Sequence, residues 1–481
     1  MDGRRLLDCG RMRSRWAWAT LAVAASLALG LSWCITRGPL TLNDGFGPIL
    51  ESRLSESVHD TYEGALYSRG YWRPLRMVQI KLVVDATPAD STSAFKAIHV
   101  ALTIAAFLLF AAWIRPRSLT EFGAAGIALM IVAGHHSFFV LFSEAYPINH
   151  FLEILALALA VACLARGEPR WWKGVLAALI VAVGAVTIES GLLIGVVAIA
   201  CWMVGWRGVS GSGVVAVLVV LAGYLYVRFG VLEIPTPGLD ERSAGWWLDR
   251  LGPSELLARF GDNPLPFYAY NVMASALDVL FSEPRAGSWQ IAGRWVEDNM
   301  RPWNYVHLIS SLLVTGALLA ALGPALRHWW ARALEDRDRF VLLAFIMIAA
   351  NSVVSFGYVK DEVLSVGAVF YAGGAFAVLA GLADRVNGRG IRRTAVIVVL
   401  LSASILWSSR AAGTFFSLQA SAFKVSSDWA QYSLDRESEE IRNTGATRRA
   451  YEAMRARSLS YGVPHPVFTK QQRVDRYLEV Q

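Results

Sequence analysis

The residues best suited to chemistry lie in short polar segments between long apolar runs. Asp44 lies in an Asn-Asp-Gly segment soon after the first apolar run, and Arg73 lies in a Tyr-Trp-Arg-Pro-Leu segment of the same polar stretch. Lys360 comes much later, between two apolar runs. A carboxylate can take the proton from an acceptor hydroxyl, while fixed cations stabilise the charge that grows on a departing phosphate. Asp44, Arg73 and Lys360 together would meet these needs in a group transfer from a lipid phosphate.

Supporting polar residues occupy similar positions between apolar runs. They are Tyr71, Glu144, Glu189 and Asp361. We expect Glu189 near the membrane surface, at a turn between two short spans, because a carboxylate at mid-bilayer would cost several kcal/mol. Simpler roles stay open for the whole set. Asn-Asp-Gly is ordinary turn chemistry, an arginine can anchor a helix at the membrane interface, and Lys360 can pair with Asp361.

The neighbouring histidines His135 and His136 raise the question of a metal site. Adjacent side chains point in different directions on a helix, and no carboxylate or cysteine follows them at ligand spacing. The sequence therefore predicts no metal site and no cofactor beyond a donor substrate, and leaves dependence on a divalent metal open. No His-Glu-x-x-His, phosphate-binding glycine loop or Gly-x-Ser-x-Gly is present, which disfavours protease, ATPase and serine-hydrolase activities.

The elements that must position these residues are membrane helices. Hydrophobic residues make up 55% of the chain and charged residues 17%, with a mean hydropathy of +0.42, so many apolar side chains must face lipid. They come in blocks of about 18 to 22 residues, the length at which a helix crosses about 30 Å of hydrocarbon. The sequence therefore predicts an all-α polytopic membrane protein with about eleven transmembrane helices. The net charge of +7 comes with arginines clustered at helix ends, which fits membrane topology and disfavours nucleic-acid binding.

Charge placement predicts three regions and their orientation. Residues 1–15 form a basic cytoplasmic tail, because five arginines precede the first apolar run. That run could be a signal peptide, but its length favours an uncleaved anchor. Residues 16–410 form the transmembrane domain, with long outer loops at 36–91 and 231–303. Residues 411–481 form a polar tail on the non-cytoplasmic side.

Three apolar segments need separate treatment. Residues 122–142 are expected to form one continuous span, and residues 174–206 two short spans that turn at Glu189. Residues 265–281 are nearly long enough to cross, yet they include Asn271 and Asp278 and are bounded by prolines. We expect this third segment to be re-entrant or interfacial rather than spanning.

The order of these pieces resembles the GT-C superfamily of membrane glycosyltransferases, in particular its protein O-mannosyltransferase-like branch. The shared features are an acidic motif soon after the first helix, the Tyr-x-Arg-Pro-Leu segment, and a later outer hairpin that carries Tyr358, Lys360 and Asp361. They extend over about residues 15 to 410. The resemblance implies a GT-C fold, a polyprenyl-phosphate sugar as donor, and an inverting transfer to a hydroxyl acceptor on the non-cytoplasmic face.

The resemblance also implies roles by position. Asp44 would be the catalytic base, Arg73 and Lys360 would bind the donor phosphate, and Glu144 and Glu189 would be supporting polar residues. Many members of the superfamily carry two adjacent acidic residues in the first loop, where this chain has Asn-Asp. Asp44 is therefore the candidate base in this motif, and a metal-binding role for it is in doubt.

The expected partners follow from this interpretation. They are a lipid-linked sugar donor, a protein, lipid or glycan acceptor, and membrane lipids. The expected location is a bacterial inner membrane, with the N-terminus cytoplasmic and the C-terminus outside. The alternative functions are a transporter or flippase, or a non-catalytic binding protein, for lipid-linked saccharides. A transporter would more naturally show an internal repeat and broken helices deep in the bilayer.

Overall fold

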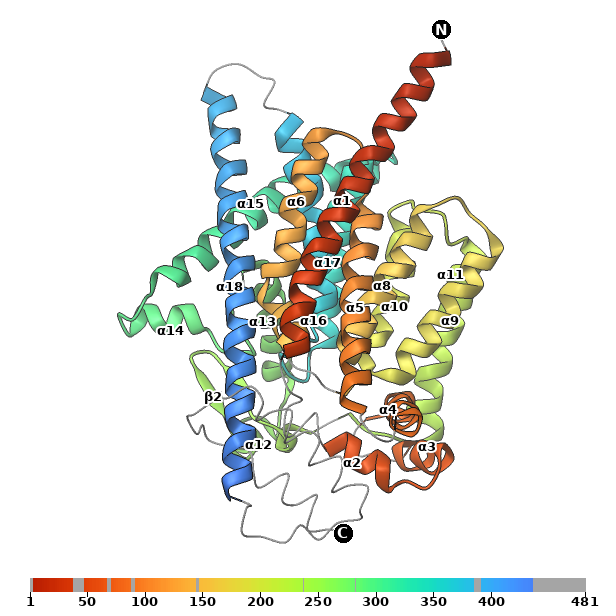
Figure 1. The fold of residues 1–481 in the computed structure, drawn as a ribbon, viewed down its shortest axis with the longest axis vertical. Helices are drawn as coiled ribbons and strands as arrows, with labels where there is room; N and C mark the ends of the chain where they lie inside the picture. The colour runs from red at the N-terminus through yellow and green to blue at the C-terminus, as the bar shows by residue number, and fades with distance from the viewer. Residues whose placement is uncertain are drawn as a thin grey trace.

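The computed structural model describes residues 3–37, 47–66, 71–87, 91–143, 147–236, 238–281, 283–384 and 391–435. Long helices run side by side through its centre (Figure 1). In the described part of the chain, six helices are long and apolar enough to cross a membrane. They are α1 (Gly3–Arg37), α5 (Ser91–Ile114), α11 (Gly211–Leu225, continued by a π-helical turn over Tyr226–Val231), α15 (Pro302–Trp330), α17 (Ser365–Asp384) and α18 (Ile391–Asp435). The chain is thus a predominantly helical, polytopic membrane protein.

Shorter helices complete the bundle and explain why more spans were expected. They are α8 (His150–Arg166), α9 (Trp171–Thr187), α10 (Leu192–Met203), α13 (Leu265–Phe281) and α16 (Asp336–Val354). Of these, α9 and α10 lie in the segment 174–206 that the apolar pattern predicts as two short spans, and α13 occupies the segment 265–281. A turn over Glu189–Gly191 joins α9 to α10, so the predicted turning point at Glu189 is confirmed.

One predicted span is broken. The segment expected to be continuous forms α6 (Leu119–Gly134) and α7 (His136–Ser143), which meet at an angle of 61°. His135 adopts an extended conformation between them, and its side chain supplies the local hydrogen bonds. Its Nδ1 accepts from the backbone N–H of Ser137, and its Nε2 lies 3.0 Å from the carbonyl oxygen of Val279. Polar partners of this kind make a broken helix tolerable inside a bundle.

The helix α17 forms the centre of the core. Every residue from Ser365 to Ala380 is buried, and α16, α6 and α15 pack around it. Small residues allow this packing, because a Cβ atom at Gly373 would lie 2.4 Å from the ring of Trp113. By contrast, α9, α11 and α18 expose large apolar side chains such as Leu179, Val219 and Ile405. Exposed apolar faces of this kind fit contact with lipid.

The two ends of the bundle differ. The arginine-rich end, at the top of Figure 1, holds the α5–α6, α8–α9 and α15–α16 connections, where Arg117 lies 3.0 Å from Asp336. The loop-rich end, at the bottom, holds α2 (Gly47–Leu54), α3 (Val58–Leu66), α4 (Pro74–Ala86), α12 (Pro253–Phe260) and a small antiparallel pair, β1 (Ala244–Trp246) with β2 (Asp249–Leu251). A short helix, α14 (Gln290–Val296), precedes α15. The helix α18 continues to Asp435, beyond the expected domain boundary at residue 410.

Candidate functional site

A cavity of about 350 Å³ opens at the loop-rich end of the bundle. Its walls come from the segment before α4, the start of α8, the α9–α10 turn, the end of α11, the chain around β1, and the end of α16. Most of the lining is apolar, with Phe151, Leu192 and Phe356 among its residues. Its charged side chains are Arg73, Glu189, Arg228 and Arg242. The cavity therefore combines an apolar interior with a small set of fixed charges.

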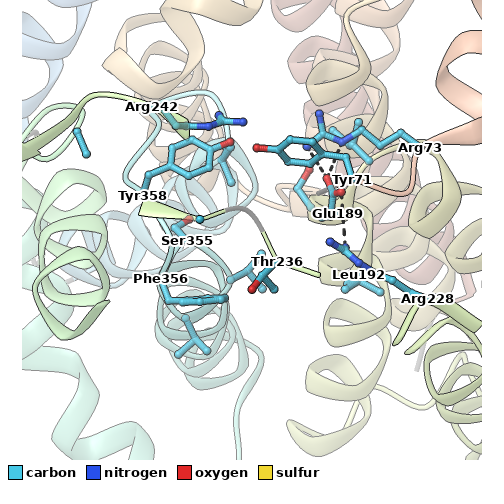
Figure 2. A pocket seen from close by; sticks show the side chains of 18 of the residues that line it. Tyr71, Arg73, Glu189, Leu192, Arg228, Thr236, Arg242, Ser355, Phe356 and Tyr358 are labelled. Carbon is cyan, nitrogen blue, oxygen red and sulfur yellow. Dashed lines mark hydrogen bonds and ion pairs between the residues drawn. The ribbon is translucent and has the colours of Figure 1, made fainter. Parts of the chain in front are cut away.

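An ion-paired group lies on one wall. Two nitrogens of Arg73, Nε and one terminal nitrogen, lie 2.6 and 2.5 Å from Oε2 of Glu189. A terminal nitrogen of Arg228 lies 3.6 Å from Oε1 of the same carboxylate and donates to the hydroxyl of Tyr224 at 3.2 Å. Figure 2 shows Glu189 between the two arginines. One carboxylate thus holds two guanidinium groups at the cavity wall.

Local sequence explains how these side chains are positioned. Pro74 begins α4, where a missing N–H costs nothing, so the chain leaves Arg73 at the cavity edge. Glu189 lies in the tight α9–α10 turn, where Gly191 packs against the backbone of Gly184. Arg228 lies in the π-helical turn that ends α11, and such turns often occur at functional sites. Segments far apart in the sequence therefore converge on one carboxylate.

The opposite wall carries a third arginine between aromatic rings. The guanidinium carbon of Arg242 lies 4.3 Å from the ring centre of Tyr358 and 5.3 Å from that of Tyr71. The Tyr71 ring also lies 4.0 Å from the guanidinium carbon of Arg73. Figure 2 shows Arg242 and Tyr358 facing Tyr71 across the cavity. Stacking on aromatic faces holds an arginine while leaving its N–H donors available to an anion.

The balance of charge favours an anionic ligand. Among the described residues, three arginines line the cavity against one carboxylate, and the guanidinium fork matches the oxygens of a phosphate or carboxylate. The apolar lining reduces competition from water and strengthens such contacts. A molecule with an anionic head and an apolar chain would match both parts of the cavity.

The structure places the predicted residues in different surroundings. Tyr71, Arg73 and Glu189 come together at the cavity, as described above. Lys360 forms an ion pair with Glu362, and its Nζ lies 5.3 Å from the ring centre of Phe151, which lines the cavity. Burial raises the pKa of Glu362, and the Lys360 ammonium opposes that shift.

Asp361 faces a different neighbourhood. Its Oδ1 accepts a hydrogen bond of 2.9 Å from the backbone N–H of Ala286, rather than pairing with Lys360. Asp44, the predicted base, and Glu144 lie outside the described residues.

Sequence reasoning missed Arg228, Arg242 and Tyr358 as members of one site. A signal for Arg228 was present, because a charged residue near the end of an apolar span marks a functional candidate. Arg242 lies in a long polar stretch with several other arginines, and only the packing of that stretch places it beside Tyr71. Comparison with protein-family models, with curated proteins and with solved structures gives no match to this chain.

Proposed function

We propose that this protein is an inverting glycosyltransferase of the GT-C type, which moves a sugar from a polyprenyl phosphate to a hydroxyl acceptor. The loop-rich end would face the non-cytoplasmic side of a bacterial inner membrane. One observation carries the proposal: in the part of the chain that the structure describes, an apolar cavity at one end of a membrane bundle is lined by three arginines against one carboxylate. A lipid phosphate has the same division between an anionic head and an apolar chain.

The chemistry assigns a task to each group. Asp44 would accept the proton of the acceptor hydroxyl, whose oxygen attacks the anomeric carbon from the face opposite the phosphate. The bond between that carbon and the phosphate oxygen breaks, and the bonding electrons leave with the polyprenyl phosphate. Arg73, Arg228 and Arg242 would stabilise the phosphate charge that develops. Glu189 would keep two of these arginines in place.

Donor binding and transfer can be tested separately on purified protein. Binding of radiolabelled undecaprenyl phosphate in detergent would compare wild type with Arg73→Gln and Arg242→Gln. Loss of one charge-assisted contact of about 1.5–3 kcal/mol predicts a binding constant about 10 to 100 times weaker for each variant. Arg250→Gln is the matched control, because Arg250 is exposed on β2 at the same end and does not line the cavity.

Transfer would be measured in liposomes with a panel of polyprenyl-phosphate sugars and a cell-envelope extract as acceptor. Wild type should move label to an acceptor, and Asp44→Asn should bind donor normally without transfer. Binding without transfer by both proteins would favour the transporter or non-catalytic interpretation. Equal binding of undecaprenyl phosphate by wild type and both arginine variants would refute the assigned phosphate site.

A further inference from the structure

A second polar cluster lies apart from the cavity and contains metal-ligand side chains. His136 begins α7, Asp278 lies near the end of α13, and Asp361 lies in the connection from α16 to α17. One donor atom from each, an imidazole nitrogen or a carboxylate oxygen, lies within 4.8 Å of the other two. None of the three residues lines the cavity. Three segments distant in sequence thus bring one histidine and two carboxylates together.

The geometry fits one shared ion. Nε2 of His136 lies 2.7 Å from Oδ1 of Asp278. Ligand atoms about 2.1 Å from one ion lie about 3.4 Å apart in a tetrahedral site. The 2.7 Å contact is somewhat shorter than this separation, and the three donor atoms all lie within 4.8 Å of one another. The three donor atoms are therefore close enough for one ion to contact all of them.

The burial of Asp278 provides an independent argument. Its side chain is fully buried, and neither carboxylate oxygen has a hydrogen-bond partner among the described residues. The contact with His136 lacks the alignment of a hydrogen bond, and the neighbouring Asp361 is a second carboxylate. A buried carboxylate without an aligned hydrogen bond is costly, and two adjacent carboxylates repel each other unless a cation or a proton lies between them.

We propose that His136, Asp278 and Asp361 bind one divalent transition-metal ion, with Zn²⁺ or Mn²⁺ the best match to one imidazole and two carboxylates. Neighbouring groups orient the ligands. The N–H of Ala286 holds Asp361, and the contact of His135 with the carbonyl of Val279 fixes the α6–α7 bend next to α13. The bend that interrupts the predicted span therefore has a role, because it places His136 opposite Asp278.

The sequence predicted no metal because the three ligands lie far apart along the chain. The absence of a carboxylate near His135 and His136 in sequence was correctly observed, but Asp278 and Asp361 reach the histidine through tertiary packing. The ligand Asp361 was expected to support donor binding instead. The metal site does not depend on the glycosyltransferase proposal, and its test measures metal rather than activity.

The test uses the full-length protein in detergent. After stripping with a chelator, wild type is incubated with Zn²⁺, desalted and analysed for metal content by mass spectrometry, and Mn²⁺ binding is followed by electron paramagnetic resonance. Wild type should retain about one equivalent of Zn²⁺ and gain thermal stability from it, since a ligand that binds the native state stabilises it. Asp278→Asn and His136→Gln should bind at least about tenfold more weakly.

Glu362→Gln is the matched control, because Glu362 is buried in the same connection as Asp361 and is not among the three ligands. It should retain metal like wild type. Equal metal retention by wild type and Asp278→Asn would overturn the site, and so would wild type that binds neither ion. A shared proton in place of a metal would make the thermal stability of wild type depend on pH and leave it unchanged by Zn²⁺ or Mn²⁺, which also overturns the proposal.

Discussion

At the scale of single residues, Glu189 has two opposing effects on the cavity. Its carboxylate pairs with Arg73 and lies 3.6 Å from Arg228, so it fixes both cations against a mostly apolar wall. The same negative charge weakens the attraction of that wall for an anionic ligand. Arg242, held by the Tyr71 and Tyr358 rings, carries a charge that Glu189 does not neutralise directly. Arginines held by a carboxylate or by aromatic rings are already in position, so they can contact a phosphate without rearrangement.

Another buried carboxyl gives a prediction about pH. Glu283 follows α13 and is buried, and its Oε2 accepts a 2.9 Å hydrogen bond from the backbone N–H of Ile291. Burial raises its pKa from 4.5 to about 7 in the folded protein, although that hydrogen bond opposes the shift. The protonated form therefore stabilises the fold, and this contribution is complete below pH 4.5 and is lost as the pH rises through about 7.

The comparison of wild type with Glu283→Gln isolates this effect, because glutamine keeps the shape and cannot ionise. Between pH 4.5 and pH 8 the stability of wild type should fall relative to the variant by up to about 3 kcal/mol. Thermal unfolding in one detergent across this pH range provides the measurement. Parallel curves for the two proteins would show that Glu283 does not titrate with a raised pKa.

At the scale of elements, the apolar pattern predicted most helix positions because lipid imposes a simple length rule. Residues 265–281 were singled out by composition, and they form α13 with those bounds. The turn at Glu189 followed from the cost of a carboxylate in hydrocarbon. The bend at His135 could not be predicted in the same way, because the carbonyl partner of its side chain, Val279, lies 144 residues away in the sequence.

The candidate site was predictable to a similar degree. Tyr71, Arg73 and Glu189 were selected because each is polar beside an apolar run, and they share one wall of the cavity. The positions of Arg242 and Tyr358 depend on how two loops pack against each other. Local sequence does not determine that packing. Asp361 was expected to support the donor site, and its carboxylate lies within 4.8 Å of the ligand atoms of His136 and Asp278 instead.

The α9–α10 hairpin that holds Glu189 gives a second prediction. A Cβ atom at Gly191 would lie 2.0 Å from the carbonyl oxygen of Gly184, which is backbone and cannot rotate away. Gly191→Ala should therefore destabilise the protein by at least about 2 kcal/mol and displace Glu189, which also weakens binding of undecaprenyl phosphate. In the control Gly223→Ala, the new methyl group on α11 meets no atom within 4 Å.

The control variant should unfold at the wild-type temperature or slightly above it, since alanine favours a helix over glycine by about 1 kcal/mol. Thermal unfolding and donor binding would be measured on both variants in the same detergent. A Gly191→Ala protein as stable as Gly223→Ala would mean that the two helices of the hairpin can separate without cost. The close approach would then have no part in positioning Glu189.

At the scale of the whole molecule, charge is distributed unequally between the two ends. The arginine-rich end carries Arg117, Arg166 and Arg337, which interact with acidic partners such as Asp336 and Asp384. Both the cavity and the proposed metal site lie at the loop-rich end. The chain reaches that end through α1, which begins in a basic N-terminal segment. Basic loops stay on the cytoplasmic side during insertion, so the two sites should face outward.

Labelling of single cysteines tests this orientation. In a background with the four native cysteines replaced by alanine, Ser254→Cys lies exposed on α12 beside the cavity, and Ala333→Cys lies exposed in the α15–α16 connection. A maleimide that cannot cross membranes should label Ser254→Cys in intact spheroplasts and label Ala333→Cys only after the membrane is opened. The reverse pattern would place the cavity on the cytoplasmic side, where a soluble nucleotide sugar could serve as donor, and would remove the main reason for a lipid-linked one.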